Sequence, residues 1–412
     1  MERNLNFQNK KPELVSPAGD WPSLQSAIKA GADAVYFGIK DLNMRYAASN
    51  FDLFEVKKII DLLHENGKKG YLALNIIVYN NELDKIRKIL ERARDDGVDA
   101  VILWDMAVMS IARELGLKMH LSTQASVSNV SALKFYASCG IERVILAREC
   151  TLHEIKNIVS QVKKESLRCS VETFIHGSMC ASVSGRCFLS HQVFDKSANR
   201  GKCIQPCRRE YTIIDSENEC SYVLGKDYVL SAKDLCTIDF IDKLIEAGIE
   251  AFKIEGRMRA AEYVTTVTSA YRKAIDAHAK GQFTKELKES LKRNLDKVHN
   301  RSFTNGFYFG KPDDLGGRVQ KRYEKIYLGD VVNFYNKVGV AEILIRNESL
   351  SAGEEVLIMG KTTPATFAMA REMQIEHKNV EFAKKGSAVG VKLPFKVRPH
   401  DKVFLWRQYN EN

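Results

Sequence analysis

The feature that most constrains this chain is one theme repeated through its first 260 residues or so, in which a short β-rich run precedes an amphipathic helical pattern. Glycine followed by a small or branched residue and an acid marks the joins, as in Gly31-Ala-Asp33 and Gly97-Val-Asp99. Such a glycine is typical of a helix C-terminus that leads into the next parallel strand. The expected strands are 13–16, 34–37, 70–74, 100–104, 120–122, 144–147, 171–175 and 251–254. Eight units over about 250 residues predict a TIM-like (β/α)8 barrel, an α/β fold.

An open doubly wound sheet is the alternative arrangement of such units. The first expected strand is not followed by the glycine-rich phosphate fingerprint of that fold, so the barrel is favoured. We expect the barrel to occupy residues 1–280, with a cysteine-bearing insertion at 176–250 and a basic helical and aromatic connector at 281–325. Short alternating strands with glycine turns then predict a small C-terminal β-barrel over 326–412.

The insertion after the seventh expected strand is far longer than a βα loop needs. It carries Cys180, Cys187, Cys203 and Cys236 in loops rich in glycine and serine, and Cys207 competes with Cys203 for a place in the same group. An odd total of nine cysteines cannot all pair in disulfides. Thiolates gathered from loops suit an iron–sulfur cluster. Structural zinc and scattered thiols are the alternatives, and the spacing lacks the Cys-x-x-Cys pairs of a zinc ribbon.

Polar residues at strand ends are the other candidates, because barrel enzymes build their sites there. Arg148, Lys253 and Arg257 lie at or near strand ends and would bind an anionic substrate, since guanidinium groups pair with carboxylates through two parallel hydrogen bonds. Ordinary ion pairs are their alternative role. Glu172 and His176 are candidate catalytic residues. The alternatives are a buried ion pair for Glu172 and a structural role beside the cysteine loop for His176.

The net charge of +10 is not evenly spread. Residues 1–250 carry 33 basic and 33 acidic side chains, so the whole excess lies in the last 162 residues. This distribution predicts a polyanionic partner that touches the C-terminal half, with a solvated basic surface as the alternative. The chain has no apolar run of about eighteen residues and no signal-peptide pattern, so we expect a cytoplasmic protein without a membrane segment.

Hydrolase chemistry is the rival class. The chain has no His-Glu-x-x-His motif, because His153-Glu154 lacks the second histidine, and it has no Gly-x-Ser-x-Gly elbow. Cys180 and His176 would be a nucleophile and a base, but a separation of four residues in a loop does not establish a hydrogen bond between them.

A longer signature resembles the peptidase U32 family, the "collagenase-like" proteins. It reads Glu172-x-Phe174-x-x-Gly177-Ser178-Met179-Cys180 and then Gly185-x-Cys187-x-Leu189-Ser190. Further similarity is found in Ser16-Pro-Ala-Gly19, Ala32-Asp-Ala-Val-Tyr-Phe-Gly38, Ser231-Ala-Lys-Asp-Leu-Cys236 and Phe252-Lys-Ile-Glu-Gly-Arg-Met258. In length and layout the chain is similar to the tRNA-hydroxylating branch of that family.

This resemblance implies oxygen-independent 5-hydroxylation of the wobble uridine of tRNA, with prephenate as co-substrate. It also implies a 4Fe-4S cluster, and carried over residue by residue its ligands would be Cys180, Cys187, Cys203 and Cys236. We expect the basic C-terminal half to hold the anticodon arm of the tRNA, and the need for a partner subunit is left open. A U32-type peptidase and an RNA-binding module with a structural metal are the alternative functions.

Overall fold

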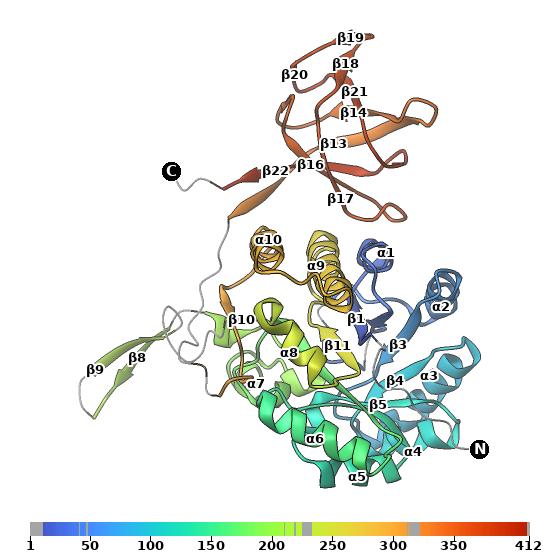
Figure 1. Ribbon diagram of the computed structural model, residues 1–412, viewed down its shortest axis with the longest axis vertical. Coiled ribbons are helices and arrows are strands. Elements are labelled where there is room, and N and C mark those ends of the chain that lie inside the picture. The colour runs from blue at the N-terminus through green and yellow to red at the C-terminus, as the bar shows by residue number, and fades with distance from the viewer. Residues whose placement is uncertain are drawn as a thin grey trace.

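The computed structural model describes residues 11–40, 42–46, 48–209, 211–217, 220–224, 233–310, 312 and 322–409. These residues form an α/β barrel and a C-terminal antiparallel sheet, which Figure 1 shows one above the other. In the described part of the chain, no helix is both long enough and apolar enough to cross a membrane.

Eight parallel strands close the barrel. They are β1 (Glu13–Ala18), β2 (Ala34–Phe37), β3 (Lys69–Ala73), β4 (Ala100–Leu103), β5 (Met119–Leu121), β6 (Ile141–Ile145), β7 (Ser170–Ser178) and β11 (Ala251–Ile254). Each strand pairs with the next, and β11 pairs with both β1 and β7, which completes the ring. The prediction of a TIM-like barrel is confirmed. The sixth strand was predicted three residues too late, because β6 begins directly after Gly140, which ends the preceding helix at a φ of 96°.

Helices surround this ring (Figure 1). They are α1 (Trp21–Lys29), α2 (Val56–Glu65), α3 (Leu83–Asp95), α4 (Met106–Glu114), α5 (Val130–Ser138), α6 (Leu152–Lys164), α8 (Ile241–Glu246), α9 (Ala261–Ala279) and α10 (Lys285–Asp296). Their apolar residues recur at helical spacing: α3 buries Ile86, Ile89, Leu90 and Ala93 and leaves its charged residues outside. The helices therefore form the outer layer and leave the two ends of the barrel open to loops.

The insertion leaves from β7 and returns to it. The first part of β7 pairs with β11, and its last residues pair with the antiparallel strand β10 (Asp234–Cys236). Strand β10 in turn pairs with β12 (Phe303–Thr304), so part of the predicted connector belongs to the barrel sheet. Between β7 and β10 lie α7 (Leu189–Phe194) and the hairpin of β8 (Tyr211–Asp215) and β9 (Cys220–Leu224), which projects from the barrel in Figure 1.

The C-terminal sheet is antiparallel, in the order β17-β16-β22-β13-β14-β21-β18-β19. Its strands are β13 (Tyr323–Tyr335), β14 (Val340–Ile345), β16 (Glu355–Met359), β17 (Thr366–Met369), β18 (Met373–Ile375), β19 (Lys378–Asn379), β21 (Ala388–Lys392) and β22 (Lys402–Gln408), and β15 (Leu350–Ser351) pairs with β20 (Phe382–Ala383). The sheet curls around its own apolar core. The predicted small C-terminal β-structure is present, and because its two edge strands do not pair with each other in the described part of the chain, it is a half-barrel.

The half-barrel packs on the outer helices of the α/β barrel. The Lys325 ammonium lies 3.1 and 3.2 Å from the two carboxylate oxygens of Glu262 on α9. The backbone N–H of Ala365 donates to Ser26 Oγ of α1 at 3.0 Å. Trp406 joins the barrel core. The sheet is thus attached through α1 and α9, which leaves the ends of the barrel strands uncovered by these contacts.

Candidate active site in a cysteine-lined cavity

A cavity of about 220 Å³ opens at the carboxyl ends of the barrel strands. Six strands contribute to its walls, through Tyr36, Ala73, Ile102, Ile145, Phe174 and Lys253. The insertion after β7 forms another wall. This end of the barrel is where enzymes of this fold carry their active sites. The cavity is many times larger than the space of one water molecule, so it can hold a cofactor or a substrate of several atoms.

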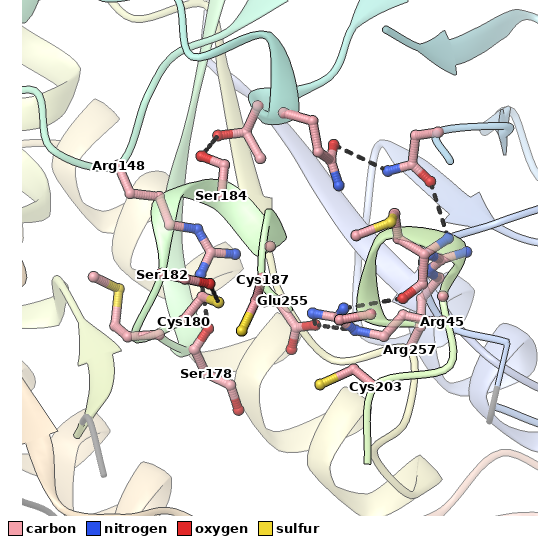
Figure 2. Close-up of a pocket in the computed structure, with 18 of the residues that line it drawn as sticks. Arg45, Arg148, Ser178, Cys180, Ser182, Ser184, Cys187, Cys203, Glu255 and Arg257 are labelled. Atoms are coloured by element: carbon pink, nitrogen blue, oxygen red, sulfur yellow. Dashed lines mark hydrogen bonds and ion pairs between the residues drawn. The ribbon is translucent and has the colours of Figure 1, made fainter. Parts of the chain in front are cut away.

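Four cysteines of the insertion line this cavity: Cys180, Cys187, Cys203 and Cys207. Figure 2 shows the thiols of Cys180, Cys187 and Cys203 pointing toward one another. Three of the sulfurs have a hydrogen-bonding group two residues later in the chain. These contacts are Ser182 Oγ to Cys180 Sγ at 3.2 Å, the N–H of Leu189 to Cys187 Sγ at 3.3 Å, and the N–H of Gln205 to Cys203 Sγ at 3.4 Å. Donors aimed at sulfur favour the thiolate form that binds metals.

The charges around the thiols act in opposite directions. Burial alone would raise the pKa of Cys180, but hydrogen bonds with Ser182 and the positive charges of Arg148 and Arg45 outweigh burial and lower this pKa. Burial raises the pKa of Cys207, and although Arg208 opposes this, the three neighbouring cysteines raise the pKa further. Four thiolates in one cavity repel one another, so a cationic group between them would relieve that repulsion.

The residues present fit an iron–sulfur cluster better than a single metal ion. Among the described residues, no three histidine, cysteine, aspartate or glutamate side chains are close enough to hold one ion. A 4Fe-4S cluster takes one thiolate on each iron, so its ligands lie farther apart than the four ligands of one zinc ion. A group of four thiols around a common cavity, with hydrogen-bond donors on their sulfurs, is consistent with the larger group.

Cys236 does not lie with these cysteines. It is 4% exposed on β10, where it is the register partner of His176 on β7. Its sulfur lies 3.8 Å from the Tyr271 hydroxyl, and burial raises its pKa to about 11. The sequence grouped Cys236 with Cys180, Cys187 and Cys203 and left Cys207 as a competitor of Cys203. In the structure, Cys203 and Cys207 both line the cavity, and Cys236 does not. Residue spacing alone did not reveal that the insertion turns back toward the cavity at Cys207.

His176 also lies outside the cavity. Its ring is 2% exposed and contacts the rings of Tyr263, Tyr271 and Phe303, and its Nδ1 is 3.3 Å from the Tyr271 hydroxyl. Burial, helped by the charge of Arg259, lowers its pKa to about 3. The Cys180–His176 pair of a cysteine hydrolase is therefore not formed, and no described histidine lines the cavity. His176 is a structural residue behind the cysteine wall.

Glu172 belongs to a separate network inside the barrel, and it does not line the cavity. Its carboxylate accepts hydrogen bonds from Lys253 at 3.0 Å and Arg143 at 3.3 Å. Arg143 also donates to Glu13 at 2.7 Å. Glu172 therefore forms the buried ion pair that was the alternative to a catalytic role. Lys253 borders the cavity, but its ammonium is already bound to Glu172, so it is not free to bind a substrate carboxylate.

The cavity itself holds an excess of cations (Figure 2). Arg45 donates to Glu255 Oε1 through Nε at 3.1 Å and Nη2 at 2.8 Å. Arg257 donates to the Asn43 side chain at 3.1 Å. Arg148 donates to the Ser178 carbonyl at 3.0 Å, and its buried Nε has no partner. Three guanidinium groups thus share one carboxylate, which predicts an anionic ligand.

Sequence reasoning missed Arg45, because it looked at the residues directly after each strand. Arg45 lies in the long connection from β2 to α2. Gly201 of the insertion brings this connection to the cysteines, since a Cβ atom there would lie 2.0 Å from the Asn43 carbonyl oxygen, and its φ of 79° favours glycine. The length of the connection was the available signal, because long loops at this end of a barrel carry function.

The chain is similar over most of its length to one family model and to several known proteins. The model of the family described as Peptidase family U32 matches residues 19–317. A protein from Methanocaldococcus jannaschii named as an uncharacterized protease is 46% identical over 96% of this chain and 98% of its own. A collagenase of Porphyromonas gingivalis is 38% identical over 97% of this chain and 99% of its own. The tRNA hydroxylation protein P1 of Bacillus subtilis is 35% identical over 85% of this chain and 84% of its own.

Proposed function

The chain belongs to the peptidase U32 family, and we propose that within it this protein is an RNA-modifying enzyme that hydroxylates a uridine of tRNA. The proposed reaction replaces the hydrogen on C5 of the wobble uridine with a hydroxyl group. This change is a two-electron oxidation, so it requires an electron acceptor and a source of oxygen. The enzyme must hold a redox group and a small co-substrate beside one nucleobase.

One observation carries the proposal: four thiols and four guanidinium groups, those of Arg45, Arg148, Arg208 and Arg257, line the same cavity. The thiols suit a redox cofactor, and the guanidinium groups suit an anionic co-substrate. Apolar strand residues such as Ile102 and Ile145 line part of the cavity, and a low local dielectric strengthens the electrostatic interactions beside them. Hydrolysis of a peptide would use at most one of these thiols, together with a general base.

We propose Cys180, Cys187, Cys203 and Cys207 as the ligands of a 4Fe-4S cluster. When bound, the cluster supplies one-electron transfer at a potential that depends on hydrogen bonds to its sulfurs. The backbone N–H groups that donate to Cys187 and Cys203 would stabilise the thiolates in this role. Arg45 and Arg148, whose charges lower the pKa of Cys180, would do the same for its sulfur.

We propose prephenate, which the family resemblance implies, as the co-substrate. A dicarboxylate would neutralise the two positive charges that Glu255 leaves uncompensated. Arg148 and Arg257 are its proposed partners, because each makes one hydrogen bond to the protein and keeps further N–H groups for a ligand. The reaction is independent of O2 if the co-substrate supplies the hydroxyl oxygen and is itself reduced by the two electrons that C5 of the uridine loses.

A peptidase is the second candidate, since one relative is named as a collagenase. Cys180 would be its nucleophile, because the residue is exposed and its pKa is lowered. However, the described residues that line the cavity include no histidine, and Glu255 is already bound to Arg45. The nucleophile therefore lacks a general base, which ranks this function second.

The test is anaerobic purification with iron and sulfide analysis, followed by mass spectrometry of tRNA incubated with and without prephenate and O2. We expect about four irons per chain and prephenate-dependent 5-hydroxyuridine. Cys207→Ser should lower iron content and abolish the product, whereas Cys139→Ser, at a half-buried thiol on the outer layer, should change neither. Collagen cleavage by an iron-free protein that does not modify tRNA would overturn the proposal.

A further inference from the structure

Four cations of the insertion lie over aromatic rings, and each of these cations is next in the chain to a residue that lines the cavity. Four such pairs are present: Arg186 over Trp104 at 4.8 Å, Arg200 over Tyr79 at 4.7 Å, Lys202 over Tyr46 at 5.1 Å, and Arg209 over Phe194 at 4.5 Å from the ring centroid. We call these eight residues the mouth rim. Cation–aromatic pairs form stable flat surfaces that remain wet on their outer side.

The topology of the barrel puts these pairs along one edge. Tyr46 follows β2, Tyr79 follows β3 and Trp104 follows β4, so three consecutive strands supply the rings at their carboxyl ends. Tyr46 is 45% exposed and Tyr79 is 56% exposed. Arg200 also forms an ion pair with Glu82 and holds the insertion onto its neighbouring loop. The exposed tyrosines are therefore fixed in position while their rings stay accessible.

The mouth rim is also basic, although residues 1–250 as a whole carry equal numbers of basic and acidic side chains. Residues 176–209 contain six lysines and arginines and a single acidic residue, Asp195. The balance of zero over residues 1–250 arises because residues 210–250 carry ten acidic and only three basic side chains. The C-terminal half-barrel is attached at α1 and α9 instead, and residues 322–412 carry only 14 basic against 11 acidic side chains. Folding has thus concentrated positive charge at the cavity.

Arginines continue this surface beyond the insertion. Arg259 donates to Ser178 Oγ at 2.9 Å and to Asp234 at 3.2 Å. The buried Nε and Nη1 of Arg301 have no hydrogen-bond partner among the described residues. Burial and the nearby charge of Arg208 lower the pKa of Arg301 to about 10. Three guanidinium groups around the single carboxylate of Asp234 are the arrangement that a phosphate group would complete.

We propose that the mouth rim, rather than the C-terminal half-barrel, binds the RNA, and that it takes an unpaired loop. This inference rests on the proposed function. Unpaired bases stack on aromatic rings and guanidinium planes, whereas the base faces of a duplex are covered by their neighbours. The target base has to leave its stack to enter a cavity of about 220 Å³. Arg208, Arg259 and Arg301 bind the backbone phosphates of the same loop.

The experiment measures fluorescence anisotropy of a labelled anticodon stem-loop RNA on the anaerobically purified full chain at several salt concentrations. Tyr46→Ala and Tyr79→Ala should each weaken binding about 5- to 100-fold, the effect of one lost stacking contact. Tyr46→Phe, which keeps the ring, should restore affinity. Phe135→Ala on α5 and Phe382→Ala in the half-barrel are matched controls at similarly exposed rings, and both should bind normally. A fully paired RNA of the same length should bind more weakly.

Several outcomes would overturn the inference: normal binding by both tyrosine variants, loss of binding in Phe382→Ala, or equal affinity for paired and unpaired RNA. Stronger binding of a collagen peptide than of the stem-loop would assign the rim to a protein partner and also overturn it. Hydroxylation is measured in parallel. Tight, ring-dependent RNA binding without any product would contradict the proposed function and leave the rim assignment standing. Product formation together with normal RNA binding by the tyrosine variants would support the proposed function and contradict the assignment of the mouth rim.

Discussion

The barrel contains two buried groups of charges that use the same residue types in different proportions. In the interior group, the carboxylates of Glu13 and Glu172 form ion pairs with Arg143, Lys253 and the more exposed Lys69. At the cavity, the carboxylate of Glu255 lies near Arg45, Arg148 and Arg257 but forms its ion pair with Arg45. Each cation of the first group is thus paired with a carboxylate, whereas Arg148 and Arg257 are hydrogen-bonded to neutral groups. A buried charge that the protein leaves without a partner marks the place where a ligand supplies one.

The cysteines divide in the same way. Cys236 is enclosed beside Tyr271 and His176, while Cys207 faces the cavity with three other thiols. Substitutions of interior residues are expected to change the free energy of unfolding, and substitutions of cavity residues are expected to change ligand binding. Each of the following measurements tests that division, beginning with the largest expected effect.

Glu172→Gln should give the largest loss of stability. The change leaves Arg143 and Lys253 buried without this counter-charge, which costs about 3–5 kcal/mol for a buried pair, less whatever Lys253 saves by releasing its proton. The free energy of unfolding from urea titration is the measurement. Glu172→Gln combined with Lys253→Met should recover part of the loss. A stable single variant with reduced hydroxylation would instead return Glu172 to the catalytic residues.

The interior group should make the protein sensitive to acid. Burial alone would raise the pKa of Glu13, but Arg143, Lys69 and Tyr71 lower it from 4.5 to about 2. Because the unfolded chain takes up this proton first, the stabilisation is present above about pH 4.5 and is lost as the pH falls toward 2. It amounts to at most about 3 kcal/mol at 1.36 kcal/mol per pKa unit.

Unfolding free energies between about pH 6 and pH 3 check this, with Glu13→Gln as the comparison. The dependence of the unfolding free energy on pH should become weaker in the variant. It should not vanish, because Arg45 overcomes the effect of burial and holds the pKa of Glu255 at about 2 as well, so this carboxylate titrates in the same range. An unchanged slope would contradict the role of Glu13.

Substitution of Cys236 should affect stability, whereas substitution of Cys207 should affect iron binding. Cys236→Ser buries a hydroxyl group in place of a thiol and should cost about 1–3 kcal/mol of stability while iron content stays normal. Cys207→Ser, at a half-buried position, should change the stability of the iron-free chain by less than about 1 kcal/mol and should lower iron content. Iron and sulfide analysis beside urea titration distinguishes them. Loss of iron in Cys236→Ser would restore the ligand set that the family resemblance implies.

Arg257→Gln should have the smallest effect on stability. Burial and the charge of Arg45 lower the pKa of Arg257 to about 10 despite Tyr36 and Glu255, so the fold does not favour this charge. Unfolding free energy should change by less than about 1 kcal/mol, while the KM for prephenate should rise about 10- to 100-fold, as expected for a lost charged hydrogen bond. A large loss of stability without a change in KM would assign Arg257 to the structural group.

Much of the fold was predictable because its signals are local. Apolar periodicity and helix-ending glycines identified all eight barrel strands and placed their first residues to within one residue, except for the sixth strand. The strand-end rule also found Arg148 and Arg257, since parallel strands bring their carboxyl ends together. The rule could not find Arg45, and it could not separate His176 and Cys236 from the cavity, because that depends on which way each side chain points after β7 and β10 pair.

The sequence by itself determined the alternation of strands and helices, the position of the long insertion and the number of thiols available to it. These features depend on propensity and spacing within a few residues. Only the tertiary structure decided that Cys207 joins Cys180, that Glu172 pairs with Lys253, and that the basic first part of the insertion, residues 176–209, lies at the cavity. Charge compensation depends on distances in space, and closure of the barrel brings together residues that are far apart in the chain.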